Sequence, residues 1–215
     1  METKEVISNR ISVSGKVLNT PVFNHEVYGE GFYVFTLDSM RSSGYVDELP
    51  ICISERLVDL DTIVPGVIVK IEGQVRTFNK RNEQNNKSHL VISVFVRKLE
   101  IIDKEDRNDY NEVELHGFIC RDTHYKITSL GRKVCEVMVA VNRRYGKSDY
   151  IPCVAWGRNA GWVNTLEVST RLQIKGRLQS RTYQKKIREN PDGTDVGETR
   201  VAYEVSIDKL KLDED

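Results

Sequence analysis

Apolar and polar residues alternate along many short stretches of this chain. Alternation with a period of two is typical of a β-strand that buries one face. Two other stretches, Glu55–Val64 and Asn159–Val168, instead suit short helices, and the first of them ends at Pro65-Gly66. The alternation predicts strands near 9–18, 31–38, 47–54, 66–78, 88–102, 111–121, 133–142, 149–156, 170–183 and 199–212. Together these elements describe an all-β chain with one short helix in each half.

The two halves of this pattern repeat each other. Gly15 and Gly117 hold matching places in alternating strands and lie 102 residues apart, and Gly73 and Gly176 lie 103 residues apart. The offset grows only across the predicted loops, where an insertion costs little. We therefore interpret the chain as a tandem duplication.

Each half has the order strand, strand, strand, helix, strand, strand. This is the order of the OB-fold, a small five-stranded barrel whose face and loops bind oligonucleotides. Glycines in the middle of strands allow the sharp bends of a small barrel, and the helix argues against the alternative of two unrelated sandwiches. We predict tandem OB-fold domains over residues 1–104 and 109–215, with a solvated, charged linker at Asp103–Asn108.

The block Asp149–Lys186 combines aromatic and cationic side chains on predicted strands. Single-stranded nucleic acid needs this combination, because its bases stack on planar faces and its phosphates attract positive charge. Any one of these aromatic residues, taken alone, is better interpreted as a core residue. The stacking candidates are Tyr150, Trp156 and Tyr183. The phosphate candidates are Arg181, Lys185 and Lys186 in this block and Arg143 and Arg144 in the predicted loop before it.

Two motifs of the second half point to a family. Tyr150–Gly157 has an aromatic residue at the start of a strand and Trp-Gly at its end, and Ile174–Tyr183 contains Lys-Gly-Arg-Leu and then Ser-Arg-Thr-Tyr. In these motifs the second half resembles the bacterial single-stranded DNA-binding protein family. The resemblance implies base stacking at four places, which are Tyr145, Tyr150, Trp156 and Tyr183.

The first half departs from this motif pattern. Glu48 and Ser54 stand where the second half has Tyr150 and Trp156. Only Phe78 matches, at the place that the second half fills with Tyr183, and Tyr45 is a further candidate in the loop of this half. We expect the first half to bind nucleic acid weakly or to serve in assembly.

The resemblance also implies how the protein assembles. Family members with two such domains per chain work as homodimers that contain four OB domains. Many members carry a long tail with an acidic tip that recruits other proteins, whereas this sequence ends at Asp213-Glu214-Asp215 without the spacer or the terminal aromatic residue. We therefore do not expect recruitment of repair proteins through a C-terminal tip.

Charge and hydropathy add two constraints. Residues 1–106 carry 13 Lys+Arg against 16 Asp+Glu, and residues 107–215 carry 19 against 16. The second half is therefore expected to make more of any phosphate contacts. The sequence has no run of about 18 apolar residues and no apolar leader, so we expect no membrane partner and a cytoplasmic location.

No catalytic or metal-binding pattern stands out in the sequence. The four histidines are scattered, and the four cysteines form no CxxC pair, so we expect no metal site, cofactor or disulfide framework. The glycine-containing turns lack the following helix that a phosphate-binding loop needs. We predict a binding protein and not an enzyme.

The predicted function is sequence-tolerant binding of single-stranded DNA in replication, repair or recombination. Two alternatives stay open at the level of the sequence. One is an OB-fold protein of replication restart (primosome type) or one that binds RNA. The other is a protein–protein assembly scaffold that has lost nucleic-acid binding, which the aromatic-poor first half and the zero net charge favour somewhat.

Overall fold

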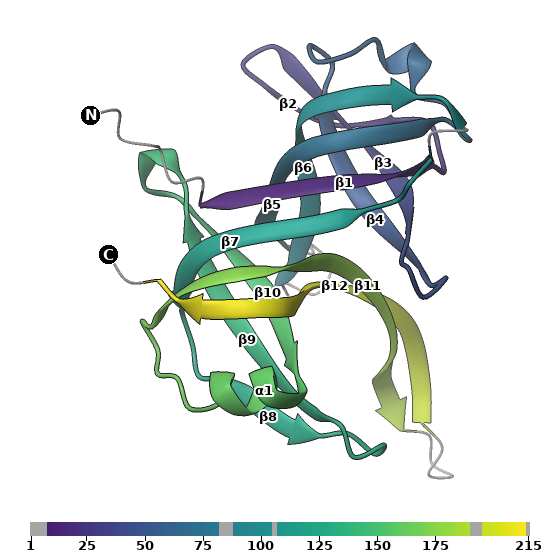
Figure 1. The fold of residues 1–215 in the computed structure, drawn as a ribbon. Coiled ribbons are helices and arrows are strands. Elements are labelled where there is room, and N and C mark those ends of the chain that lie inside the picture. The colour runs from purple at the N-terminus through teal and green to yellow at the C-terminus, as the bar shows by residue number, and fades with distance from the viewer. Residues whose placement is uncertain (1–7, 82–87, 105–106, 190–194, 214–215) are drawn as a thin grey trace.

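Two β-barrels joined by their edges make up the structure, a computed structural model that describes residues 8–81, 88–104, 107–189 and 195–213 (Figure 1). The first barrel contains β1 (Asn9–Val17), β2 (Val22–Val27), β3 (Glu30–Met40), β4 (Val46–Ser54), β5 (Ile68–Arg81) and β6 (Ser88–Ile102). The second contains β7 (Asn111–Ile119), β8 (His124–Ile127), β9 (Lys133–Asn142), β10 (Ser148–Trp156), β11 (Arg171–Glu189) and β12 (Asp195–Leu212).

Both barrels close through the same strand pairings. In the first, the strand order is β2-β3-β4-β6-β5-β1, and β1 pairs with β3 as well to close the barrel. The second repeats this order as β8-β9-β10-β12-β11-β7 and closes through β7 and β9. Only the pairs β4–β6 and β10–β12 are parallel among the described pairings. The repeated topology confirms the predicted all-β fold with tandem OB barrels.

A shared sheet edge joins the barrels, because β1 and β7 pair antiparallel. An asparagine near the start of β1 and one at the start of β7 each form two hydrogen bonds within their own barrel. The Asn9 side chain donates to the backbone carbonyl of Val75 at 2.7 Å and accepts from its N–H at 2.9 Å. Asn111 makes the same two bonds to Leu178, at 2.7 and 3.0 Å. The duplication therefore extends to individual hydrogen bonds.

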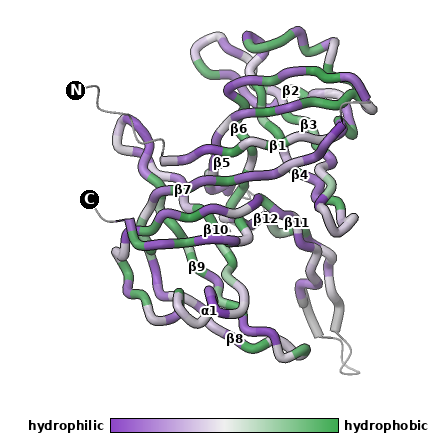
Figure 2. Tube along the Cα trace, viewed as in Figure 1, coloured by the Kyte–Doolittle hydropathy of each residue, from purple (hydrophilic) through white to green (hydrophobic). Residues whose placement is uncertain are grey.

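The barrel interiors are filled by aliphatic side chains from alternate strand positions. Hydrophobic and hydrophilic positions follow each other along the strands in Figure 2. Examples of fully buried residues are Ile11, Ile51 and Val94 in the first barrel and Leu115, Ile151 and Val205 in the second. Burial of apolar surface stabilises a fold by about 25 cal/mol per Å², so the alternation fixes which face of each strand points outward.

The first barrel has no α-helix among its described residues. The segment Glu55–Val64 forms turns and the short 3-10 helix η1 (Leu60–Thr62). The Asp59 carboxylate caps this single turn by accepting a hydrogen bond from the Asp61 backbone N–H at 3.1 Å, but Val64 precedes Pro65 and is therefore disfavoured in the helical region. The prediction of a helix in this half is therefore wrong.

The second barrel has a helix, but its bounds differ from the predicted ones. Helix α1 spans Gly157–Val163, so it begins and ends earlier than predicted, and it buries Ala160 and Val163. Strand β11 continues to Glu189 and β12 starts at Asp195, beyond the ends predicted at 183 and 199. The cationic stretch after Tyr183 thus lies on a long two-stranded ribbon.

Edge strands β2 and β8 were not predicted. All six residues of β2 are exposed, and hydrophobic alternation marks only a strand that buries one face.

No helix in the described part of the chain is long and apolar enough to span a membrane.

The linker is more tightly held than predicted. The Arg107 guanidinium donates to Asp109 at 2.6 Å and to Asp38 of the first barrel at 3.1 Å. The Asp109 carboxylate also accepts from the backbone N–H of Met40 at 2.8 Å. The end of the linker is therefore packed against the first barrel and not simply solvated.

Candidate nucleic-acid interface

The outer face of the second barrel displays two of the predicted stacking residues. Along β10, Ile151, Cys153 and Ala155 are buried in the core, so the alternate positions point outward. Tyr150 and Trp156 occupy two of these outward positions and are 49% and 40% exposed. The structure brings both aromatic residues to one face of one strand.

Tyr183 lies on the same sheet, two strands away. Strand β12 separates β10 from β11, and Tyr183 on β11 is paired with Arg200 on β12. The Tyr183 side chain is 36% exposed, and the Arg181 guanidinium lies 5.7 Å from the centroid of its ring. Aromatic surface and positive charge are therefore adjacent at this edge of the face.

Acidic residues share this outer face. The Arg181 and Gln179 side chains contact the Glu204 carboxylate at 3.4 and 2.9 Å, and Arg177 pairs with Asp208 at 3.4 Å. Several of the cations are thus already partnered. The positive charge counted in the second half does not gather on its aromatic face.

Lys185 and Lys186 follow Tyr183 on the ribbon. The Lys185 side chain is exposed. Although the Lys186 backbone belongs to β11, its side chain lies outside the described residues. The assignment of both lysines as phosphate contacts stays a prediction.

Tyr145 is placed apart from the other stacking candidates. It lies in the loop between β9 and β10 with a φ of 64°, followed by Gly146 at 68°, and its side chain is 97% exposed. Non-glycine residues in this left-handed region are uncommon and cluster at functional loops. This loop, with Arg144, borders a groove on the first barrel.

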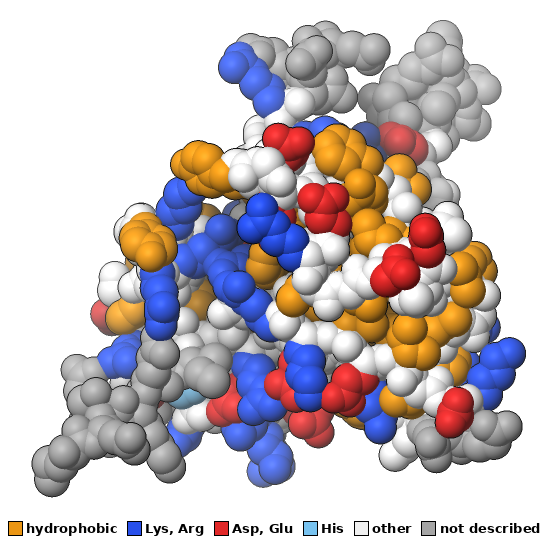
Figure 3. All heavy atoms as spheres, turned by 90° about the horizontal axis from the view of Figure 1, so that it is seen from above, with side chains coloured by type: hydrophobic (Ala, Val, Ile, Leu, Met, Phe, Trp, Pro, Cys, Tyr) orange, Lys and Arg blue, Asp and Glu red, His pale blue; other side chains and the backbone are white. Residues whose placement is uncertain are grey.

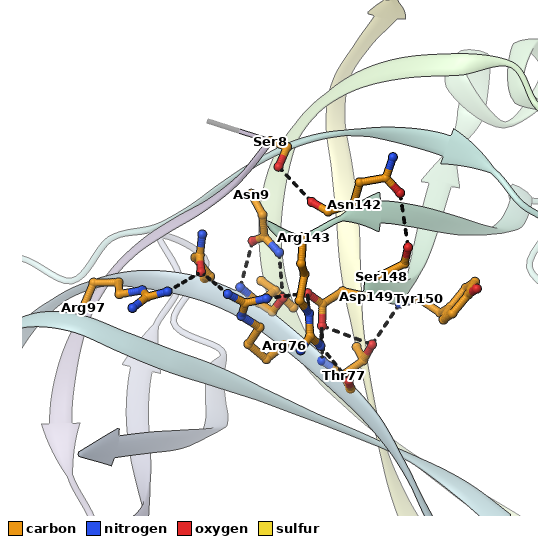
Figure 4. Close-up of polar contacts among 12 residues, drawn as sticks. Ser8, Asn9, Arg76, Thr77, Arg97, Asn142, Arg143, Ser148, Asp149 and Tyr150 are labelled. Carbon is orange, nitrogen blue, oxygen red and sulfur yellow. Dashed lines mark hydrogen bonds and ion pairs between the residues drawn. The ribbon is translucent and has the colours of Figure 1, made fainter. Parts of the chain in front are cut away.

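Arg143 differs from the other predicted cations because it is bonded inside the molecule (Figure 4). Its guanidinium donates to both carboxylate oxygens of the fully buried Asp149 and to the backbone carbonyl of Thr77, the latter at 3.0 Å. Asp149 also accepts from the Thr77 N–H at 2.6 Å. The Tyr150 N–H donates to the Thr77 hydroxyl at 2.9 Å. Arg143 therefore positions Tyr150 and joins the two barrels.

The first barrel carries the matching contact. The Arg41 guanidinium donates to both oxygens of the buried Asp47 carboxylate at 2.6 Å. Asp47 in turn accepts from the backbone N–H of Ser180 in the second barrel at 2.8 Å. Two buried carboxylates thus tie the barrels together, one from each side.

A groove of about 1490 Å³ crosses the outer face of the first barrel. It is lined by residues of the first barrel and of the β9–β10 loop of the second. Its charged lining residues are Arg10, Arg76, Arg97, Arg143, Arg144 and Lys147 against Glu72 and Asp149, six positive and two negative, or +4. Figure 3 shows Lys and Arg side chains gathered around a hollow. Positive charge therefore gathers where the first barrel meets the β9–β10 loop, and each barrel contributes three of the six cations.

Comparisons with known proteins decide the family. The model of the "Single-strand binding protein family" matches residues 110–213. "Single-stranded DNA-binding protein B" of Bacillus subtilis is 32% identical over 101 residues, which make up 43% of this chain and 83% of that protein. The chain belongs to the single-strand binding protein family. Proteins of this family are not enzymes, so this protein is not an enzyme.

Two further comparisons define what is similar. "Single-stranded DNA-binding protein 1" of Staphylococcus aureus is 36% identical over 98 residues, 42% of this chain and 56% of that protein. The crystal structure of wild-type single-stranded DNA binding protein from Thermus aquaticus superposes with a TM-score of 0.69 at 19% identity. It covers 96% of this chain and 93% of that one. The likeness in fold therefore extends over both barrels, whereas the family model covers the second.

Between the two barrels of this chain, Phe78 is structurally equivalent to Arg181 and not to Tyr183. The β-bulges at Glu72/Gly73 and Lys175/Gly176 align strand β5 with β11 at an offset of 103 residues. The match read from the sequence is therefore wrong by two residues. Phe78 is nevertheless exposed and lines the groove.

Sequence reasoning missed Arg76, Phe95 and Arg97, which line the same groove. A signal for them was present, because Arg76-x-Phe78 and Phe95-x-Arg97 each place a cation and an aromatic residue two positions apart on a predicted strand. Residues at that spacing share a face. Within the described ranges, no three His, Cys, Asp or Glu side chains are placed to hold a metal ion.

Proposed function

We propose that this protein binds single-stranded DNA, with little sequence preference, on the outer face of the second barrel. The observation that carries the proposal is the exposure of Tyr150, Trp156 and Tyr183 on neighbouring parts of one sheet, in the barrel that the family model covers. Stacking on an aromatic side chain contributes about 1–3 kcal/mol per base and tolerates any sequence, since every base has a flat face.

Cations around these aromatic residues complete the proposed site. Arg181 lies against Tyr183, and Lys185 and Lys186 follow on the ribbon. Arg144 and Tyr145 extend the path from β10 toward the first barrel. Arg143 contributes by holding Tyr150 in place. Each neutralised phosphate adds about −0.7 to the slope of log affinity against log salt.

We further propose that the protein acts in replication, repair or recombination in the cytoplasm. Its barrels would form domains at 1–104 and 109–215, and two chains would form a homodimer with four OB domains. Mass measurement of the protein alone and with oligo-dT of increasing length tests the assembly and the number of nucleotides bound. A monomeric mass in both states contradicts the homodimer.

Tryptophan fluorescence tests the site itself. The chain has two tryptophans, Trp156 on the proposed face and Trp162 on helix α1. We expect oligo-dT to quench the fluorescence of the Trp162→Phe variant, which keeps only Trp156, and high salt to reverse the quenching. The matched Trp156→Phe variant should show little quenching. If Trp156→Ala binds oligo-dT as tightly as the parent protein does, the stacking face is assigned wrongly.

A further inference from the structure

Two arginines of the first barrel are held against one aromatic ring. Arg76 on β5 and Arg97 on β6 both contact the Phe95 ring, with guanidinium carbons 5.8 and 5.0 Å from its centroid. Figure 4 shows both arginines. The Gln74 side-chain oxygen accepts from Arg76 at 2.5 Å and from Arg97 at 3.3 Å. An aromatic ring and one neutral oxygen thus position two like charges side by side.

The neighbouring carboxylate does not balance this charge. Asp149 pairs with Arg76 at 3.1 Å, but the same carboxylate also accepts both bonds from Arg143. Among the described residues, no carboxylate forms an ion pair with Arg97. Burial lowers the pKa of Arg76, and the nearby Arg143 and Arg97 lower it further, whereas Asp149 raises it. The like charges of Arg76 and Arg97 repel each other, so a bound anion would stabilise this pair of arginines.

The position of Arg97 favours contact with a ligand. Strand β6 has its extra residue at this point, because Glu72 pairs with Lys98 and the next residue, Gly73, pairs with Val96. A β-bulge re-aims the side chain of the extra residue. The Arg97 side chain is exposed and lines the groove, and so do the exposed rings of Phe78 and Tyr145.

We propose that Arg76 and Arg97 bind a backbone phosphate of single-stranded DNA, and that the groove of the first barrel is a second binding surface for the strand. The inference rests on the proposed function for the identity of the ligand. A long polyanion fits better than a small phosphate compound, since the +4 lining is spread over both barrels and exposed aromatic rings accompany it. Because the β9–β10 loop borders the groove, this surface is complete only when both barrels are present.

A pair of neighbouring substitutions on β6 tests the proposal. Arg97→Gln and Lys98→Gln remove the same charge from adjacent exposed positions, but Lys98 lies outside the groove lining and pairs with Glu100. We expect Arg97→Gln to bind a long, labelled oligo-dT about 5-fold more weakly at low salt and to reduce the salt slope by about 0.7. Lys98→Gln should behave like the parent protein. Equal affinities and slopes for the two variants would overturn the proposal.

Fluorescence of Trp156 separates this proposal from the proposed function. If oligo-dT quenches Trp156 in the parent protein but the two variants bind equally, the second surface fails and the aromatic face stands. If Trp156 is not quenched but Arg97→Gln still weakens binding, the aromatic face fails and the groove stands. Equal dependence on Arg97 for duplex DNA of the same length would overturn the assignment to single strands.

Discussion

The two barrels share their internal contacts and differ on their outer faces. In the first barrel the outer face carries Arg76, Phe95 and Arg97, and the matching positions of the second barrel carry Gln179, Ser206 and Asp208. The second barrel instead carries Tyr150 and Trp156, where the first has Glu48 and Ser54. The cation–aromatic group around Phe95 is thus present on one copy, and the pair Tyr150 and Trp156 on the other.

The contacts that join and close the barrels show no such divergence. The pairs Arg41–Asp47 and Arg143–Asp149 each tie one barrel to the other. The Asp47 and Asp149 carboxylates are buried, and a buried charge without its partner is costly, so their geometry leaves little freedom. Outward positions lack this requirement. The comparison teaches that one scaffold can keep its joining contacts while its two copies carry different residues on their outer faces.

The buried carboxylates offer the most severe test of the shared scaffold. Asp149→Asn and Asp47→Asn each remove a buried partner of an arginine, and we expect each to lower the free energy of unfolding by about 3–5 kcal/mol. Asp149→Asn should cost more, because it leaves both Arg76 and Arg143 without their carboxylate. Urea unfolding followed by circular dichroism measures the effect.

The exposed pair Lys98–Glu100 supplies the control for this test. Glu100→Gln also removes one carboxylate from an ion pair, but both side chains are more than half exposed. We expect almost no change in the free energy of unfolding, because solvent screens an exposed ion pair. A loss for Asp149→Asn no greater than that for Glu100→Gln would show that the buried contact does not hold the barrels together.

Matching glycines test the scaffold at a second place, with a smaller expected effect. A Cβ at Gly73 would collide with the backbone carbonyl oxygen of Phe95, and one at Gly176 with that of Ser206. We expect Gly73→Ala and Gly176→Ala each to lower the free energy of unfolding by about 2 kcal/mol, the cost of overpacking. The control is Gly161→Ala in helix α1, where a Cβ meets no atom within 4 Å. We expect this variant to raise the free energy of unfolding slightly, because alanine favours a helix more than glycine does. A clear difference between the two strand variants would contradict the matched scaffold.

Much of the fold follows from the sequence, because alternation reports burial directly. The even spacing of Tyr150 and Trp156 on one strand also places them on one face. The pairing of Arg143 with a buried carboxylate is harder to predict, since an arginine that binds phosphate and one that pairs with Asp149 have the same side chain. A signal existed in the repeat: both Arg41 and Arg143 are followed by an aspartate six residues later.

The charged groove was not predicted for a different reason. Its cations come from β1, β5, β6 and a loop of the other barrel, so they meet only through strand pairing and the joining of the barrels. A count of charge by halves assigns the loop with Arg144 and Lys147 to the second half, although it borders the groove of the first. Local sequence does not report which strands become neighbours.

Asp208→Arg tests the difference between the outer faces with the smallest expected effect. It gives the second barrel the residue type that the first barrel has at Arg97. Asp208 occupies the matching bulge, its side chain is 57% exposed, and its carboxylate pairs with Arg177 at 3.4 Å. Loss of so exposed a pair should change stability by less than about 1 kcal/mol. We expect oligo-dT to bind about 3-fold more tightly at low salt, with a salt slope steeper by about 0.7. Anisotropy titrations over a range of salt concentrations measure both.

Asp61→Arg, the same charge change at an exposed position of η1 outside the groove lining, should have little effect. If it tightens binding as much as Asp208→Arg does, net charge and not the outer face governs the affinity.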